Sequence, residues 1–237
     1  MAGPYPCNNV DLMSFVPRST FGGDLNDCWG WTDPNNAKEY ALVGLTTGTA
    51  FVDITDPVNP VLVGSLPTHT FNSTWRDIKV YNGHAFIVSE ASNHGMQVFD
   101  LSRLDTVSNP PVTFTANAHN ASFGRAHNIV INEDMGMAYV VGANQCGGGL
   151  WMLNISDPVN PILAGCHDLD GYIHDAQCVI YRGPDVAYQG QRICFNCHSG
   201  ADKLSIVDVT DPTDPQHISI GTWSPANIGH QGWLSED

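Results

Sequence analysis

Charged residues are scarce in this sequence of 237 residues. They make up 14% of the chain, against about 25% in an average soluble protein, which argues against a helical bundle or a coiled coil. Basic residues are the scarcest, since 9 Lys and Arg stand against 24 Asp and Glu and give a formal net charge of −15 at pH 7. Phosphate backbones and anionic lipid surfaces repel such a chain, so we exclude nucleic acid as a partner.

Long apolar runs are also missing. No stretch approaches the roughly 20 apolar residues of a membrane-spanning helix, so the sequence predicts no transmembrane segment. The motifs G-x-S-x-G, G-x-x-x-x-G-K and H-E-x-x-H do not occur, and they are the common signals of hydrolases, phosphate-binding loops and zinc proteases. These absences make us lean against an enzyme.

Turn-forming residues, in contrast, are abundant, with 23 Gly and 15 Pro in a chain that is 42% hydrophobic. One short phrase recurs in which a strand leads into an Asp-Pro turn. Its copies are VDITDPVNP (52–60), LNISDPVNP (153–161) and VDVTDPTDP (207–215), with a weaker one, VFDLSRL, at 98–104. Their spacing of about 50 residues is the size of one four-stranded propeller blade.

We therefore predict an all-β fold, a β-propeller of four-stranded antiparallel blades. The chain holds about four blades and the start of a fifth, so we expect it to be C-terminally incomplete. The predicted blades span 28–66, 76–116, 127–165, 174–223 and, in part, 230–237. The stretch 112–116 is the expected outer strand of the second blade, and 10–17, within the N-terminal segment 1–27, is expected to supply a ring-closing strand.

Several phrases of the sequence resemble the choice-of-anchor B family, whose repeats are related to the LVIVD type. They include NDCWGWTDP, WRDIKVY, HAFIVSEASNHGMQVFDLSRL, AHNIVINED, GYIHDAQCVIY and HQGWLSED, and the resemblance covers nearly the whole chain. It implies an exported, propeller-like protein that is attached to a cell surface through a C-terminal region beyond Asp237. It implies no particular reaction.

Seven cysteines favour an oxidising, extracellular setting. Their layout favours three disulfides, although six cysteines alone allow 15 connectivities. The expected pairs are Cys7–Cys28, Cys146–Cys166 and Cys178–Cys194. Three Asn-X-Ser/Thr sequons, at Asn72, Asn120 and Asn154, are candidate glycosylation sites.

The string Cys194-Phe195-Asn196-Cys197-His198 also matches the C-x-x-C-H pattern that attaches c-type haem. We favour a structural role for these residues, because Cys194 lies in a predicted strand with Cys178 as a ready partner. A haem or redox protein stays open as the weakest functional hypothesis.

In a propeller the first strand of each blade lines a central channel, so residues about 50 positions apart converge there. The channel set that we predict consists of His127, His174, His230, Asp77 and Asp175. Imidazole suits transition metals and carboxylate suits calcium, so these residues are candidate ligands of a divalent metal. The alternative is that they only satisfy backbone groups and ordered water.

A second set of polar residues follows the second strands, before glycine-containing turns, and is expected on one loop face. Its members are Glu90, His94, Asn144, Asn196 and His198. Loops on a rigid scaffold commonly build binding sites, but Asn and Glu also cap turns. The six tryptophans are expected mainly in blade packing; exposed ones would instead offer a platform for sugars.

The leading functional hypothesis is a secreted or cell-surface, non-enzymatic binding or structural module. Its partner would be a protein or glycan at the cell surface, or copies of the chain itself. The alternative is a metal-dependent, hydrolase-like enzyme in which the channel histidines hold a metal that activates water.

Overall fold

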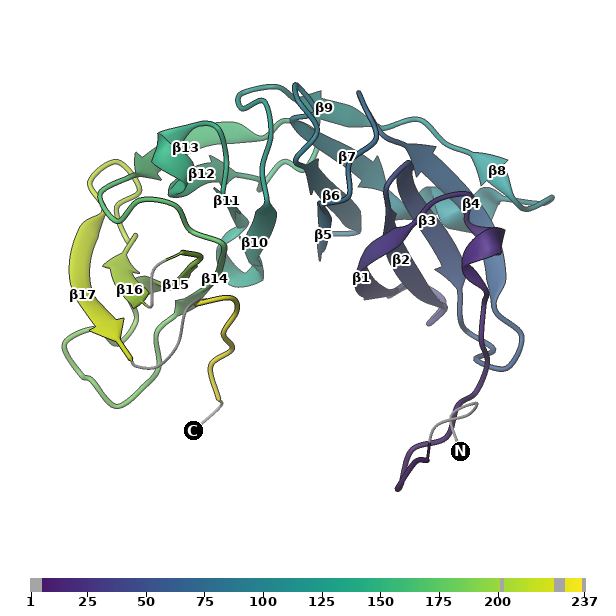
Figure 1. Ribbon diagram of the computed structural model, residues 1–237, viewed down its shortest axis with the longest axis horizontal. Coiled ribbons are helices and arrows are strands. Elements are labelled where there is room, and N and C mark those ends of the chain that lie inside the picture. The colour runs from purple at the N-terminus through teal and green to yellow at the C-terminus, as the bar shows by residue number, and fades with distance from the viewer. Residues whose placement is uncertain (1–5, 201–202, 224–228, 236–237) are drawn as a thin grey trace.

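The computed structural model describes residues 6–200, 203–223 and 229–235, and almost all regular structure in them is β. The strands form four sheets that follow one another along an arc (Figure 1). Helices in these described ranges are limited to short 3-10 segments. They are η1 (Arg18–Thr20), η2 (Leu101–Thr106), η3 (Glu133–Met135) and η4 (Cys146–Gly148).

The first two sheets are built from consecutive antiparallel strands, and each gains one further strand from the chain between residues 112 and 120. The first sheet contains β1 (Leu25–Thr32), β2 (Glu39–Leu45), β3 (Gly48–Asp53), β4 (Val61–Pro67) and β8 (Val112–Thr113). The second contains β5 (Arg76–Tyr81), β6 (His84–Ser89), β7 (Met96–Asp100) and β9 (Ala118–Asn120).

The third and fourth sheets are four-stranded antiparallel meanders, as the repeat predicts. The third contains β10 (Asn128–Asn132), β11 (Met137–Val141), β12 (Leu150–Asn154) and β13 (Ile162–His167). The fourth contains β14 (Asp175–Ile180), β15 (Arg192–His198), β16 (Lys203–Asp208) and β17 (Gln216–Thr222).

The recurring phrase forms the same turn in each sheet. The residue that ends the third strand accepts a hydrogen bond on its side-chain oxygen from the backbone N–H two positions later, at 2.8 to 3.0 Å. In such an Asx turn, this bond makes the chain turn directly after the strand ends. The residues that make this bond are Asp53, Asp100, Asn154 and Asp208.

Three hydrophobic cores lie between successive sheets. Phe51 and Phe99 stack between the first and second sheets, with ring centroids 4.6 Å apart. Val88 and Val140 belong to the core between the second and third, and Tyr139 to that between the third and fourth. Central strands are buried on both faces, so β11 is buried throughout. Each buried side chain of this size contributes about 1.5–3 kcal/mol.

The first strand of each sheet lies on the concave side of the arc, and the last strands lie on the convex side (Figure 1). Strand β5 packs against both β1 and β10, and β14 continues the series beside β10. This propeller-like arrangement brings equivalent positions of different repeats together on the concave side.

The predicted place of the stretch 112–116 is wrong. Strand β8 pairs in parallel with β4 of the first sheet, through Gly64 and Val112, and β9 takes the outer place in the second sheet. Two features explain the difference: a side chain at Gly64 would overlap the carbonyl of Val112, and Phe114 packs edge-on against Phe51 in the first core. Burial of one aromatic ring decides the pairing.

Neither expected terminal strand is found among the described residues. Residues 10–17 contain no strand, and the N-terminal segment extends away from the first sheet (Figure 1). Residues 229–235 also contain no strand; Leu234 donates its N–H to Oε1 of Gln177 in β14 instead of joining a ladder. The rest of the predicted 230–237 segment, 236–237, lies outside the described residues.

Candidate functional site

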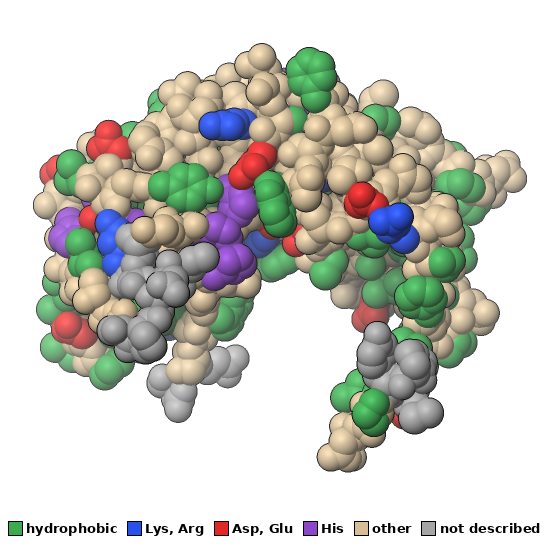
Figure 2. Space-filling view, in the orientation of Figure 1, with side chains coloured by type: hydrophobic (Ala, Val, Ile, Leu, Met, Phe, Trp, Pro, Cys, Tyr) green, Lys and Arg blue, Asp and Glu red, His purple; other side chains and the backbone are tan. Residues whose placement is uncertain are grey.

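A cavity of about 820 Å³ opens between the first strands of the four sheets. Its walls carry side chains from β1, β5, β10 and β14, and residues 230, 231 and 233 close one side. Figure 2 shows one group of histidine side chains near the middle of the arc, beside hydrophobic ones. The repeat therefore brings polar side chains of different sheets to one cavity.

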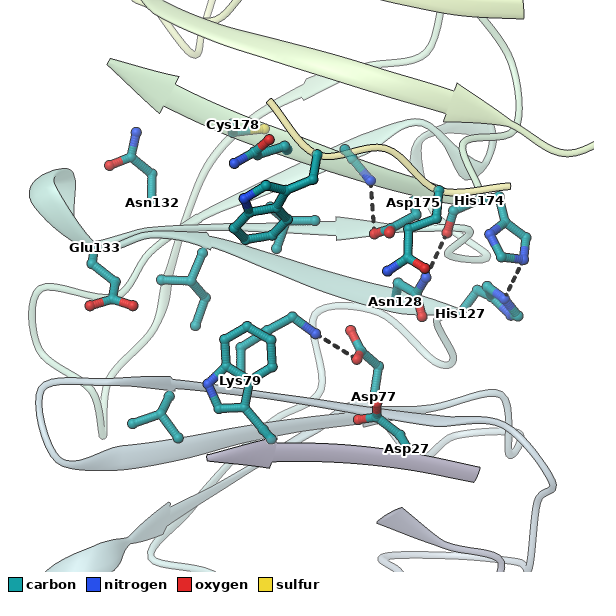
Figure 3. A pocket seen from close by; sticks show the side chains of 18 of the residues that line it. Asp27, Asp77, Lys79, His127, Asn128, Asn132, Glu133, His174, Asp175 and Cys178 are labelled. Atoms are coloured by element: carbon teal, nitrogen blue, oxygen red, sulfur yellow. Dashed lines mark hydrogen bonds and ion pairs between the residues drawn. The ribbon is translucent and has the colours of Figure 1, made fainter. Parts of the chain in front are cut away.

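Two of the predicted histidines meet at one end of this cavity (Figure 3). The Nε2 atoms of His127 and His174 are 2.9 Å apart, and the ring centroids are separated by 4.2 Å. Both residues directly precede a first strand, β10 and β14, and these neighbouring strands hold them together. The 47 residues between them in the chain correspond to one repeat.

The other ring nitrogen of each histidine is bonded to an oxygen. His127 donates from Nδ1 to Oε1 of Glu90 at 2.6 Å, and His174 donates from Nδ1 to the carbonyl oxygen of His230 at 2.9 Å. A carboxylate and a carbonyl can only accept, so both Nδ1 atoms carry hydrogen. In the neutral rings, both Nε2 atoms then present lone pairs to each other.

Two facing lone pairs at 2.9 Å repel each other, so the contact needs either one proton shared between the two nitrogens or a metal ion beside them. The carboxylate of Glu90 is positioned as the outer partner that commonly orients a metal-binding imidazole. Burial, together with the neighbouring His127 and His230, lowers the pKa of His174 below its ordinary value. The two Nε2 atoms are therefore candidate ligands of one metal ion.

His230 contributes to this arrangement mainly through its backbone. Its ring lies 4.3 Å from that of His174, centroid to centroid, while its carbonyl oxygen fixes the orientation of His174. The side chain is exposed. The three predicted histidines are therefore together, but the carbonyl of the third, rather than its ring, holds the pair.

The predicted acidic ligands lie elsewhere in the cavity and are engaged with the protein. Asp77 accepts the N–H of Ile129 at 2.7 Å and pairs with Lys79 at 2.7 Å, so both its oxygens have partners. Asp175 accepts the N–H of Ala176 at 2.9 Å. The carboxylate of Asp77 thus links two strands, and that of Asp175 is bonded within its own strand. We therefore leave both out of the metal-binding set.

Asp27 is a cavity residue that the sequence interpretation missed. It occupies in β1 the place of Asp77 in β5, and its Oδ2 accepts the N–H of Ile78 at 3.0 Å. Burial and, second, the charge of Asp77 raise its pKa to about 7. The spacing of 50 residues between Asp27 and Asp77 was the available signal, because Asp77 makes the same bond to the next sheet through Ile129.

Exposed aromatic side chains line the cavity beside the polar groups. Trp75 is 50% exposed and Trp233 is 78% exposed, and both line the cavity. Trp29 is covered by Lys79, whose ammonium lies 4.5 Å from the ring centroid. The prediction that tryptophans serve mainly packing therefore does not describe Trp75 and Trp233, which are free to contact a ligand.

The second predicted set does not form a loop binding face. Glu90 binds His127, and Oδ1 of Asn144 accepts the N–H groups of Gly124 and Arg125, at 2.8 and 3.0 Å. These bonds match the alternative in which such residues cap turns or orient neighbours. Only Glu90 belongs to the site.

The remaining members of that set are buried in the blades. His94 is fully buried and lies 3.0 Å from Nη1 of Arg76, and burial lowers its pKa to about 4. The side-chain amide of Asn196 donates to Oγ of Ser205. Nε2 of His198 is hydrogen-bonded to the same Oγ atom. Their expected place on an exposed face is wrong: His94 is buried in the segment between β6 and β7, and Asn196 and His198 are buried residues of strand β15 itself.

The structure contains two of the three predicted disulfides, Cys146–Cys166 and Cys178–Cys194. The expected Cys7–Cys28 bridge is not among them, since Cys28 is a free cysteine.

The C-x-x-C-H string adopts a structural arrangement. Cys194 is bonded to Cys178 across β14 and β15, and Nδ1 of His198 is bonded to the carbonyl of Tyr172 at 2.8 Å. Haem attachment needs both sulfurs of the string, and one is already in a disulfide.

The three sequons differ in accessibility. Asn72 and Asn154 are exposed. Asn120 is half-buried in β9, and its amide nitrogen, the atom that would carry a sugar, donates to the carbonyl of Pro161 at 3.1 Å. Asn72 and Asn154 are therefore the better placed acceptors.

Comparison with known protein families adds one finding. The model of the LVIVD repeat matches residues 38–68 and 123–168. Two stretches of the chain are thus similar to the LVIVD repeat. The matched segments cover strands β2 to β4 of the first sheet and β10 to β13 of the third, so each LVIVD match corresponds to most or all of one sheet.

No curated protein matches the chain. Within the described ranges, no helix has the length and hydropathy that crossing a membrane requires. Two disulfides are consistent with a protein that folds in an oxidising compartment.

Proposed function

We propose that this LVIVD-repeat chain is a secreted, propeller-like binding module that holds a divalent transition metal between His127 and His174. The module is non-enzymatic: the metal site and the cavity beside it form the surface that recognises a partner on the cell exterior. The disulfides and the repeat match support the setting and the scaffold.

The observation that carries the proposal is the facing pair of Nε2 atoms at 2.9 Å, with both Nδ1 atoms committed to oxygens. Two imidazoles on one tetrahedral zinc, with bonds of 2.0–2.1 Å, have nitrogens about 3.3 Å apart. A small rotation of either ring that moves its Nε2 atom by a few tenths of an ångström gives that separation. Imidazole nitrogen favours zinc, copper or nickel over calcium.

Two protein ligands leave coordination positions for a ligand from outside. Trp75 and Trp233, both exposed on the cavity wall, offer flat apolar faces of the kind that stack on sugar rings. A glycan at the cell surface, with oxygens that reach the metal, fits this combination, and we propose it as the partner class.

The test is metal stoichiometry in protein purified without a histidine tag. After removal of metal, the wild type is titrated with zinc by calorimetry, and bound zinc is measured by elemental analysis. We expect His127→Ala and His174→Ala each to remove one equivalent. Unchanged stoichiometry in both variants would refute the site. His84→Gln is the matched control, since the His84 ring is bonded to a neighbouring turn carbonyl at 2.8 Å and is not part of the cavity lining.

Two further variants test how the pair is held. His230→Ala keeps the carbonyl that orients His174, so we expect it to retain the metal; loss of zinc would show that the ring itself is a ligand. Glu90→Ala removes the outer partner of His127, and we expect a fall in affinity of about 10- to 100-fold.

A metal-dependent hydrolase is the second candidate, and Asp27 is the observation that favours it. Its pKa of about 7 suits a general base at neutral pH, and it lines the same cavity as the histidines. Zinc-loaded protein would be assayed with nitrophenyl esters and phosphates. Turnover lost in both Asp27→Asn and His127→Ala would support catalysis, whereas wild-type rates equal to those of the two variants would exclude it for these substrates.

A further inference from the structure

A second group of potential metal ligands lies at the boundary between the third and fourth sheets, outside the cavity. His167 is the last residue of β13, Asp170 lies in the following loop, and His217 is in β17. Their ligand atoms all lie within 4.8 Å of one another. None of these residues stood out in the sequence, because they do not occupy equivalent places in the repeat.

The distances between these atoms suit one metal ion. Nε2 of His167 is 3.0 Å from Oδ2 of Asp170, and Nδ1 of His217 is 3.1 Å from Oδ1 of the same carboxylate. Ligands of a tetrahedral zinc, with bonds of 2.0–2.2 Å, lie about 3.3 Å apart. Replacement of the two ring protons by a zinc ion therefore needs only small movements.

The donor set and its burial point in the same direction. Two imidazoles and one carboxylate are a common protein ligand set for zinc. His167 and Asp170 are buried, with exposures of 3% and 9%, whereas the side chain of His217 is 35% exposed. The site thus has two shielded ligands and one at the surface, where an ion enters.

The loop that carries Asp170 is held independently of the two histidines. Lys203 donates from Nζ to the backbone carbonyl of Asp170 at 2.7 Å. The backbone of Asp170 is thereby tied to β16, which reduces the cost of ordering this loop on binding.

We propose that His167, Asp170 and His217 bind one zinc ion, which cross-links the outer strands of the third and fourth sheets. The ion is structural: it joins β13 to β17, two strands that belong to different sheets and share no ladder. Binding to the folded state alone raises stability by mass action.

The experiment uses tag-free, metal-depleted protein in the His127→Ala/His174→Ala background, where the cavity site is disabled. We expect this variant to bind one equivalent of zinc and to gain about 5 °C in melting temperature at saturating zinc. Adding His217→Gln is expected to abolish both effects, while adding His84→Gln leaves them unchanged. Cobalt in place of zinc is expected to give visible absorption only while His217 is present.

Two results would overturn the proposal: no zinc bound by the double variant when circular dichroism shows it folded, or an equivalent that survives His217→Gln. If the double variant does not fold, the wild type is compared directly with His217→Gln. A fall from two equivalents to one then supports the outer site, and unchanged stoichiometry refutes it. Because each site has its own variants, failure of one proposal leaves the other intact.

Discussion

The carboxyl of Asp27 makes the stability of the protein depend on pH near neutrality. Asp27 in β1 lies beside Asp77 in β5 on the cavity wall (Figure 3). Burial and the charge of Asp77 raise its pKa from 3.8 to about 7, while Lys79 opposes the shift. The folded protein therefore keeps this proton over a pH range in which the unfolded chain has lost it.

The sign of the effect follows from this difference in proton binding. Between about pH 4 and pH 7 the folded state binds more protons at Asp27 than the unfolded state, so stability falls as pH rises through this window. A tenfold change in proton affinity corresponds to about 1.4 kcal/mol, which sets an upper limit of about 4 kcal/mol. Solvent in the cavity screens the charge, so we expect about 1–2 kcal/mol between pH 5 and pH 8.

Asp27→Asn isolates this contribution. The amide oxygen still accepts the N–H of Ile78, but the charge beside Asp77 is removed. We expect the variant to gain stability relative to the wild type as pH rises, by about 1–2 kcal/mol from pH 5 to pH 8. The measurement is urea-induced unfolding at each pH, with disulfides intact.

The matched control is Asp134→Asn, which changes an exposed carboxyl on the short helix η3. Its stability relative to the wild type should stay constant over the same pH range. A constant difference for Asp27→Asn as well, or one that shrinks as pH rises, would refute the reasoning.

Two further predictions concern packing and turns. A side chain at Gly165 would overlap the carbonyl of Pro212, in the turn between β16 and β17, so Gly165→Ala is expected to destabilise the protein by about 3 kcal/mol. In the control Gly221→Ala, the added carbon meets its nearest atom at 4.0 Å, and the cost should be less than 1 kcal/mol. Equal melting temperatures for the two variants would contradict this. Asn144→Ala leaves two turn N–H groups without their acceptor and should cost about 1 kcal/mol, measured by urea unfolding; no loss would show that water replaces the bonds.

Local patterns predicted the strands and the way in which the repeats converge. The Asp-Pro phrase marks the same turn in successive sheets, because an Asx bond needs only residues close in sequence. The spacing of one repeat brought His127 and His174 together, since equivalent positions of neighbouring sheets lie side by side. Even the disulfide Cys178–Cys194 followed from predicted neighbouring strands.

Long-range packing decided what those patterns left open. Whether β8 joined the first or the second sheet depended on where Phe114 could be buried, which no local pattern contains. Similarly, the local pattern predicted His94 and His198 in exposed loops, but His94 is buried after β6 and His198 is a buried residue of strand β15.

The sequence alone determined the all-β repeat, its turns, the negative charge and the histidines of the concave side. Each of these depends on neighbours along the chain or on a regular spacing. The tertiary structure decided which oxygens hold each imidazole, how strongly Asp27 retains its proton, and that His167, Asp170 and His217 meet between two sheets. Those properties depend on distance and burial between segments with no fixed relation in sequence, so they emerge only when the sheets are packed together.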